Sequence, residues 1–207
     1  MFRPAAVVGA IALAAFAALA IVLPHANADN PFRAVRGNPA DRLAAQPIDD
    51  FGYDFARKCT RYPKSGTRAL EAWIGHHFRG VSWGIMRCSK LNRRHYSLHA
   101  EGRALDWHLD AHNARERATA RRMIRVLLAP DRLGNPQALA RRMGIQEIIW
   151  NCTTWWAGST ILAKYHGCYR RSGKRRRHVD DTTAHRDHVH IGLNRLGAAR
   201  KTTFWAR

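Results

Sequence analysis

The sequence predicts an α+β fold in which helices and short strands form one domain. In some segments apolar residues recur at intervals of three and four, as on a helix with one buried face. In others they alternate with polar residues, as on a strand, and glycine or proline follows several of these segments. The chain has 207 residues, 46% of them hydrophobic, which is enough for one sizeable core.

Three segments have the spacing of helices with one apolar face: residues 67–78, 114–129 and 137–143. Thr67 is the expected N-cap of the first, Pro130 ends the second and Gly144 closes the third. His77 lies on the apolar face of the first helix. We interpret it as a packed core histidine rather than a metal ligand, because no other residue of that helix has ligand spacing.

Four segments have the pattern of strands: residues 81–88, 104–109, 145–150 and 188–193. In the second, Asp106 and His108 share one face, whereas Leu105 and Trp107 share the other. A carboxylate on a strand otherwise suited to burial needs a partner, and a metal ion is one. Residues 151–183 are expected to be a long loop region.

Residues 1–28 have the features of a secretory signal peptide. Arg3 provides a positive start, an uncharged apolar run follows, Pro24 ends that run, and residues 26–28 form a small-x-small cleavage site. The run is about 19 residues long, near the lower limit for a membrane span, so an uncleaved N-terminal anchor is the competing interpretation. In either case the domain lies outside the cytoplasm, and contact with a membrane is expected only if the segment is not cleaved.

Residues 29–50 contain three prolines and predict a linker or an irregular arm lying on the domain. The folded domain is expected to span residues 51–207 and to be a monomer.

Four cysteines are present, and an even number in an exported chain indicates two disulfides. The local pairing, Cys59 with Cys88 and Cys152 with Cys168, is the one we predict. The alternatives are reduced, buried thiols or, with less support, a cysteine metal site, because the sequence has no Cys-x-x-Cys pair.

The net charge of +20 favours an anionic partner. Outside the cytoplasm this indicates peptidoglycan or another acidic cell-wall polymer, and intracellular nucleic acid is not expected. The basic run over residues 170–177 has two open interpretations: a solvated loop, or an anion-binding rim beside the functional site.

A histidine and an aspartate seven residues apart, His99 and Asp106, stand among small residues. Gly102 allows a turn between them, so that the first lies in a loop and the second on the following strand. Near the other end of the chain, His188 and His190 share one face of a strand. Since a catalytic zinc ion needs three protein ligands and one open position, we predict one zinc ion held by His99, Asp106 and His190.

Ser97, His99, Gly102, Ala104 and Asp106 match the motif of the VanY-like zinc D-alanyl-D-alanine carboxypeptidases, whose superfamily also includes hedgehog signalling domains. The chain also resembles secreted actinobacterial domains that share the residues at 148–151, 187–190 and 202–205. The resemblance implies a small antiparallel sheet that carries the zinc ion and is flanked by helices. It also implies a peptidoglycan peptide as substrate.

The same resemblance suggests two candidates for the general base. VanY-like enzymes have a glutamate three residues before the last ligand, where this chain has Asp187, and other branches use the residue that corresponds to His188. One would take a proton from water and the other would orient it or stabilise charge. Ser97 and Arg87 are the candidates for substrate binding, although Arg87 is equally well interpreted as a surface residue beside a disulfide.

These observations predict a secreted zinc peptidase that acts on peptidoglycan peptides. A non-catalytic, zinc-containing wall-binding module is the first alternative, because Asp187 replaces the glutamate of the better-known relatives. A secreted metal-dependent nuclease is the second; the basic charge and the 12 histidines suggest it, but the sequence has no recognisable nuclease motif.

Overall fold

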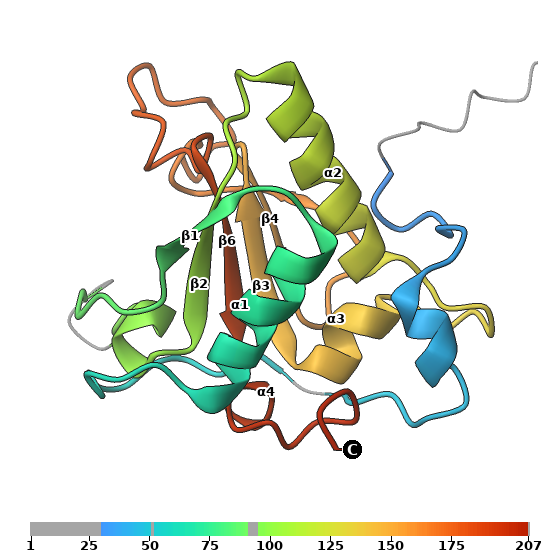
Figure 1. Ribbon diagram of the computed structural model, residues 1–207. Coiled ribbons are helices and arrows are strands. Elements are labelled where there is room, and N and C mark those ends of the chain that lie inside the picture. Colours follow the sequence, from blue (N-terminus) through green and yellow to red (C-terminus); the bar gives the residue numbers. More distant parts are fainter. Residues whose placement is uncertain (1–29, 51, 91–94, 207) are drawn as a thin grey trace, which may run out of the picture.

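The computed structural model describes residues 30–50, 52–90 and 95–206, so the predicted signal peptide and the predicted domain start at Phe51 lie outside the described residues. Within them, six strands form one antiparallel sheet in the order β1-β2-β6-β3-β4-β5. Helices α1, α2 and α3 cover one face of this sheet (Figure 1). The α+β fold class predicted from the sequence is therefore confirmed. No helix of the described residues is long and apolar enough to cross a membrane.

The helices and strands follow one another along the chain as η1 Pro39–Leu43, α1 Ser65–His77, β1 Val81–Gly84, η2 Leu98–Glu101, β2 Ala104–His108, α2 Ala114–Leu128, α3 Ala138–Met143, β3 Ile145–Trp150, β4 Thr153–Trp156, β5 Ala163–Lys164, β6 His188–Leu193 and α4 Arg195–Ala198.

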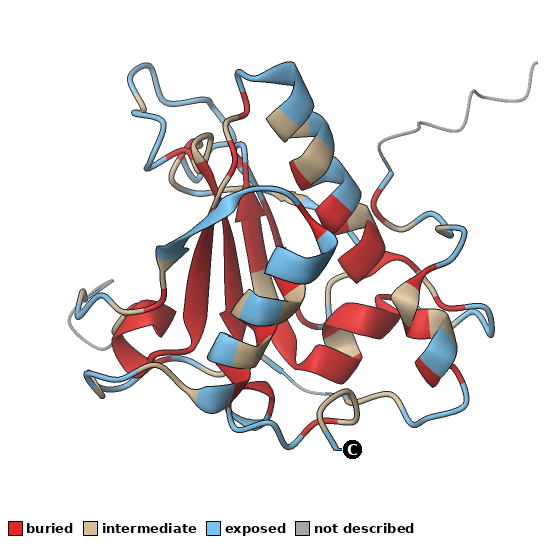
Figure 2. Ribbon diagram, viewed as in Figure 1, coloured by how far each residue is buried: buried red, intermediate tan, exposed pale blue. Residues whose placement is uncertain are grey.

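The core lies between the sheet and the helices. One set of alternating strand residues, including Leu105, Trp107, Val189 and Ile191, packs in the same cluster as the apolar stripe of α2. The central strands β2, β6 and β3 are buried along most of their length, whereas the edge strand β1 and the outer faces of α1 and α2 are largely exposed (Figure 2). The other set of alternating residues, which includes Asp106 and His190, lies on the face that the helices leave free.

Helix α1 departs from the sequence prediction in two details. It begins at Ser65, and Thr67 is not its N-cap; the buried hydroxyl of Thr67 instead donates a hydrogen bond to the carbonyl of Gly102 at 2.8 Å. The prediction of His77 as a core residue is wrong, because it is exposed and stacks on Trp73 with ring centroids 4.1 Å apart. Trp73 is only partly buried against the core, so His77 covers its ring from the solvent side.

Two strand predictions also need correction. Strand β1 ends at Gly84 rather than Cys88, since Gly84 takes a positive φ of 115° where the pairing with β2 becomes irregular. Residues 151–183 are not all loop, because β4 and β5 extend the sheet beyond β3. Both strands are short, and their apolar residues do not alternate regularly.

The N-terminal arm packs against the domain through buried groups. Ala40 of η1 is fully buried in the main core. The guanidinium of Arg142 forms a fully buried ion pair with Asp131 at 2.8 Å and also donates hydrogen bonds to the carbonyls of Ala44 and Gln46. This pair therefore ties the arm to α3.

The predicted disulfides, Cys59–Cys88 and Cys152–Cys168, are both present. The first joins the segment before α1 to the loop after β1. The second joins the start of β4 to the basic loop. Disulfides are typical of oxidising compartments, so the two bonds are compatible with an extracytoplasmic location.

Candidate metal centre

A tight turn brings His99 and Asp106 together. His99 lies on the short helix η2, which ends at Gly102 with a positive φ of 65°, and Asp106 lies on β2. A β-carbon at Gly102 would lie 2.3 Å from the carbonyl oxygen of Tyr62, so both the backbone angle and the lack of space require glycine. The seven-residue interval in the sequence therefore corresponds to a helix, a glycine turn and the middle of a strand.

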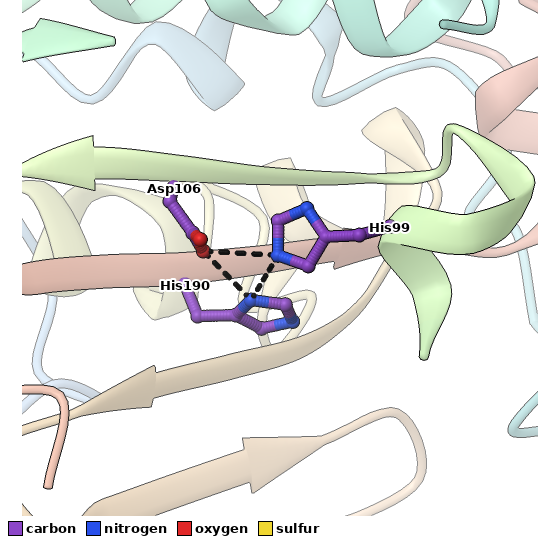
Figure 3. Close-up of side chains that lie close together, drawn as sticks. All are labelled: His99, Asp106 and His190. Carbon is purple, nitrogen blue, oxygen red and sulfur yellow. Dashed lines mark hydrogen bonds and ion pairs between the residues drawn. The ribbon is translucent and has the colours of Figure 1, made fainter. Parts of the chain in front are cut away.

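Strand pairing adds the third residue. Strands β2 and β6 are antiparallel, and their register places Asp106 directly opposite His190. Directly opposed residues point to the same face of a sheet. All three side chains therefore point to one spot beside the sheet (Figure 3), and together they form a buried group that could hold a metal ion.

Three donor atoms form a nearly equilateral triangle. The Nε2 atom of His99 lies 3.1 Å from Oδ1 of Asp106 and 3.1 Å from Nδ1 of His190, and the last two atoms are 3.0 Å apart. Ligands about 2.0–2.1 Å from a tetrahedral zinc ion lie roughly 3.3 Å from one another. The geometry of the site thus fits three ligands of such an ion.

The protonation of His99 also favours a cation. Its Nδ1 atom donates a hydrogen bond to the carbonyl of Ile85 at 2.8 Å, which leaves the lone pair of Nε2 facing Asp106 when the ring is neutral. Burial lowers the pKa of His99 below its ordinary value, although Asp106 acts in the opposite direction. A backbone carbonyl that fixes the tautomer of a metal-binding histidine is a common arrangement.

The pKa values of the other two residues, Asp106 and His190, are shifted in opposite directions. Burial alone would raise the pKa of Asp106, but hydrogen bonds with His190 and His99 outweigh it and hold the pKa well below its usual range. Burial acts to lower the pKa of His190, and the hydrogen bond and charge of Asp106 outweigh it, so the pKa is raised. The carboxylate therefore stays ionised and supplies negative charge to the centre.

His188 and Asp187 adjoin the centre in a defined order. The Nδ1 atom of His188 lies 2.6 Å from Oδ1 of Asp187, and its Nε2 atom lies 3.6 Å from Oδ1 of Asp106. The second carboxylate oxygen of Asp187 accepts a hydrogen bond from the hydroxyl of Thr182. His188 therefore stands between Asp187 and the centre.

Arg87 and Ser97 occupy different environments. The guanidinium of Arg87 is largely exposed and lies 4.0 Å from Oδ2 of Asp106, so it borders the centre. Ser97 is buried before η2, and its hydroxyl forms a hydrogen bond with that of Ser89 at 3.1 Å. In the structure Ser97 contacts the loop after β1 rather than open space.

Three aromatic residues beside the centre were not predicted as site residues. The ring of His185 lies 4.6 Å from that of His188 and 5.7 Å from that of His190, and burial lowers the pKa of His185 to about 3. Trp83, half exposed on β1, stacks on His108 with centroids 4.3 Å apart. The concentration of histidines over residues 185–190 was a signal for His185, whereas no sequence pattern pointed to Trp83.

Comparison with known proteins gives one family. The model of the family described as VldE, C-terminal domain, matches residues 59–190, a range that contains the three residues of the metal centre and all four cysteines. No curated protein and no solved structure matches the chain. The matched family is distinct from the VanY-like carboxypeptidases, so the predicted membership of the VanY-like superfamily is not confirmed.

Proposed function

The chain belongs to the VldE C-terminal domain family, and we propose that it is an extracytoplasmic zinc peptidase that hydrolyses peptide bonds in peptidoglycan stem peptides or cross-links. The observation that carries the proposal is the convergence of three buried donor atoms with His188 Nε2 beside them. The motif from Ser97 to Asp106, shared with the VanY-like carboxypeptidases, supports the peptide bond as the target. The two disulfides agree with a location outside the cytoplasm.

His99, Asp106 and His190 would hold the zinc ion, with a fourth position left for water or substrate. When bound, zinc would act as a Lewis acid toward the scissile carbonyl and would make water a better nucleophile. Two neutral histidines and one carboxylate leave the site with a net positive charge after loading, which suits the development of negative charge on a carbonyl oxygen.

His188 fits the role of general base and general acid, with Asp187 as its positioning residue. Nε2 of His188 would accept a proton from water as the oxygen attacks the carbonyl carbon. The same atom would then give that proton to the amine nitrogen as the carbon–nitrogen bond breaks, so the products are a carboxylate and an amine. The hydrogen bond between Asp187 and Nδ1 keeps the accepting lone pair on Nε2 and fixes the orientation of the ring.

The test is amine release from peptidoglycan fragments by the purified, disulfide-bonded protein loaded with one zinc ion per chain. We expect hydrolysis that a chelator abolishes and zinc restores. Zinc-loaded protein that releases no amine, while Asp187→Ala leaves both zinc content and wall affinity unchanged, would indicate a binding module instead. Degradation of plasmid DNA by the loaded protein, lost on chelation, would indicate a nuclease.

A further inference from the structure

A cationic hollow lies on the loop that follows β5. It has a volume of ≈450 Å³ and is lined by Lys164, His166, Tyr169, Arg170, Arg171, Gly173 and Arg176. Four of these residues carry a permanent positive charge and none is acidic. The loop lies at the end of the sheet opposite to α4 (Figure 1).

The backbone of this loop is held in place. The disulfide Cys152–Cys168 anchors its start, and the amide of Arg176 donates to the carbonyl of Cys168 at 2.8 Å. Within the loop, the amide of Arg170 donates to the carbonyl of Lys174 at 2.9 Å, and Tyr169 forms an isolated bridge with Arg175. The charged side chains therefore project from a defined frame rather than from an unstructured tail.

The positive charges of the hollow are not neutralised within the described part of the chain. Lys164, Arg170, Arg171 and Arg176 have no acidic partner among the described residues, and the one hydrogen bond of these side chains joins Nε of Arg176 to the carbonyl of His166 at 3.3 Å. By contrast, Arg142, Arg186 and Arg195 each pair with an aspartate. Like charges gathered in one concavity raise the local concentration of anions.

We propose that this hollow binds the phosphate groups of a phosphodiester polymer without bases, such as a polyol phosphate or phosphorylated glycan. A guanidinium group can donate hydrogen bonds to two oxygens of one phosphate group. Four cations in one hollow also favour a ligand with several negative charges over a single carboxylate. Single-stranded nucleic acid would also need free aromatic faces for its bases. Lys164 Nζ lies over the ring of Tyr169 at 5.2 Å, so a cation already occupies one face of that ring.

The hollow is close to the metal centre. Ring contacts connect His166 to Tyr165 at 4.6 Å, Tyr165 to His185 at 4.9 Å, and His185 to His190 at 5.7 Å. His166 of the hollow is therefore separated from the ligand His190 by only two intervening rings. That the bound polymer is part of the substrate rests on the proposed peptidase function. The binding of phosphate by the hollow does not depend on that function.

Calorimetric titration of the protein with inorganic polyphosphate, at 150 mM salt and without added metal, tests the binding. We expect the double variant Arg170→Gln/Arg171→Gln to weaken binding at least tenfold. The matched control Arg68→Gln/Arg115→Gln removes the same charge from exposed positions on α1 and α2 and should weaken binding less than threefold. Unchanged melting temperatures of both variants would show that folding is retained.

Equal losses in the two double variants would overturn the proposal, because binding would then depend on net charge alone. An oligonucleotide of the same phosphate number that binds tenfold more tightly than polyphosphate would overturn the assignment to a polymer without bases.

The hydrolysis assay distinguishes failure of this proposal from failure of the proposed peptidase function. The loop variant should raise KM only for wall fragments that carry phosphodiester chains, and polyphosphate binding that persists in a protein with no peptidase activity would contradict the proposed function alone.

Discussion

The Nδ1 atom of His188 lies 2.6 Å from a carboxylate oxygen of Asp187, so the opposite nitrogen of the ring is directed toward the metal centre. This relationship orders two residues that the sequence left as equivalent candidates for the base. Both carboxylate oxygens of Asp187 already form hydrogen bonds, one with His188 and one with Thr182, whereas Nε2 of His188 faces the centre. The geometry therefore favours His188 as the group that moves the proton.

Replacing His188 should separate catalysis from metal binding. His188→Gln is expected to lower kcat about 100-fold or more, the usual contribution of a general base, with zinc content unchanged. Asp187→Asn should lower kcat about 10- to 100-fold by leaving the ring poorly oriented. Steady-state kinetics and atomic absorption on the same preparations measure both quantities. A larger loss for Asp187→Asn than for His188→Gln would reverse the assignment.

Removing the metal should destabilise the fold. A ligand present at 100 times its dissociation constant stabilises a protein by about 2.7 kcal/mol, which corresponds to a melting-temperature shift of roughly 5–10 °C for a domain of this size. We therefore expect a chelator to lower the melting temperature of the zinc-loaded protein by about that amount. His190→Ala should melt at the same temperature with or without zinc. His108→Ala provides the control, since His108 lies on the same face of β2 but outside the ligand group.

The buried pair of Asp131 and Arg142 should make stability depend on acid. Burial opposes ionisation of Asp131, but hydrogen bonds from Asn135 and Arg142 outweigh it and lower the pKa of this carboxyl. As the pH falls below the ordinary aspartate pKa of about 3.9, Asp131 takes up a proton in the unfolded chain before it does so in the folded protein. The contribution of the pair to stability is therefore fully present above that pH and is lost as the pH falls through the lower pKa of the folded protein. Urea unfolding between pH 7 and pH 2.5 should show this loss.

Substitution tests the same pair at neutral pH. Asp131→Ala should lower the free energy of unfolding by about 3–5 kcal/mol, because it leaves Arg142 buried without its counter-charge. Asp50→Ala removes the partner of Arg141 from an exposed ion pair and should cost less than about 1 kcal/mol. Similar losses in the two variants would show that burial adds nothing to the pair.

The sequence predicted those parts of the fold that local periodicity determines. The apolar stripe of α2 and the alternation along β2 and β6 placed the core on one side of the sheet and Asp106 and His190 on the other. Strands β4 and β5 were not predicted because strand pairing, rather than their own residue pattern, makes them strands: β4 pairs with β3, and β5 pairs with β4. In the same way, His185 reaches the centre only through a turn in which its own φ is 51°. Contacts that depend on such turns cannot be inferred from residue spacing.

Gly102 connects the turn to the metal centre, so its replacement should affect both stability and metal affinity. The carbonyl of Gly102 accepts hydrogen bonds from the amide of Lys64 and the hydroxyl of Thr67, which hold residues 62–67 against the turn. In Gly102→Ala the new β-carbon would meet the backbone of Tyr62 at 2.3 Å and of Pro63 at 2.9 Å. We expect a loss of about 2–4 kcal/mol in the free energy of unfolding and, through displacement of His99, zinc affinity at least tenfold weaker.

Gly134→Ala separates backbone strain from this clash. Gly134 also has a positive φ, of 84°, but a β-carbon there would meet nothing within 4 Å. Strain alone costs about 1–2 kcal/mol, so Gly134→Ala should lose only that much stability and keep the zinc affinity of the original protein. Urea unfolding and zinc titration of both variants measure the difference. Equal stability losses with unchanged zinc affinity would mean that the turn relaxes around the added methyl group without moving His99.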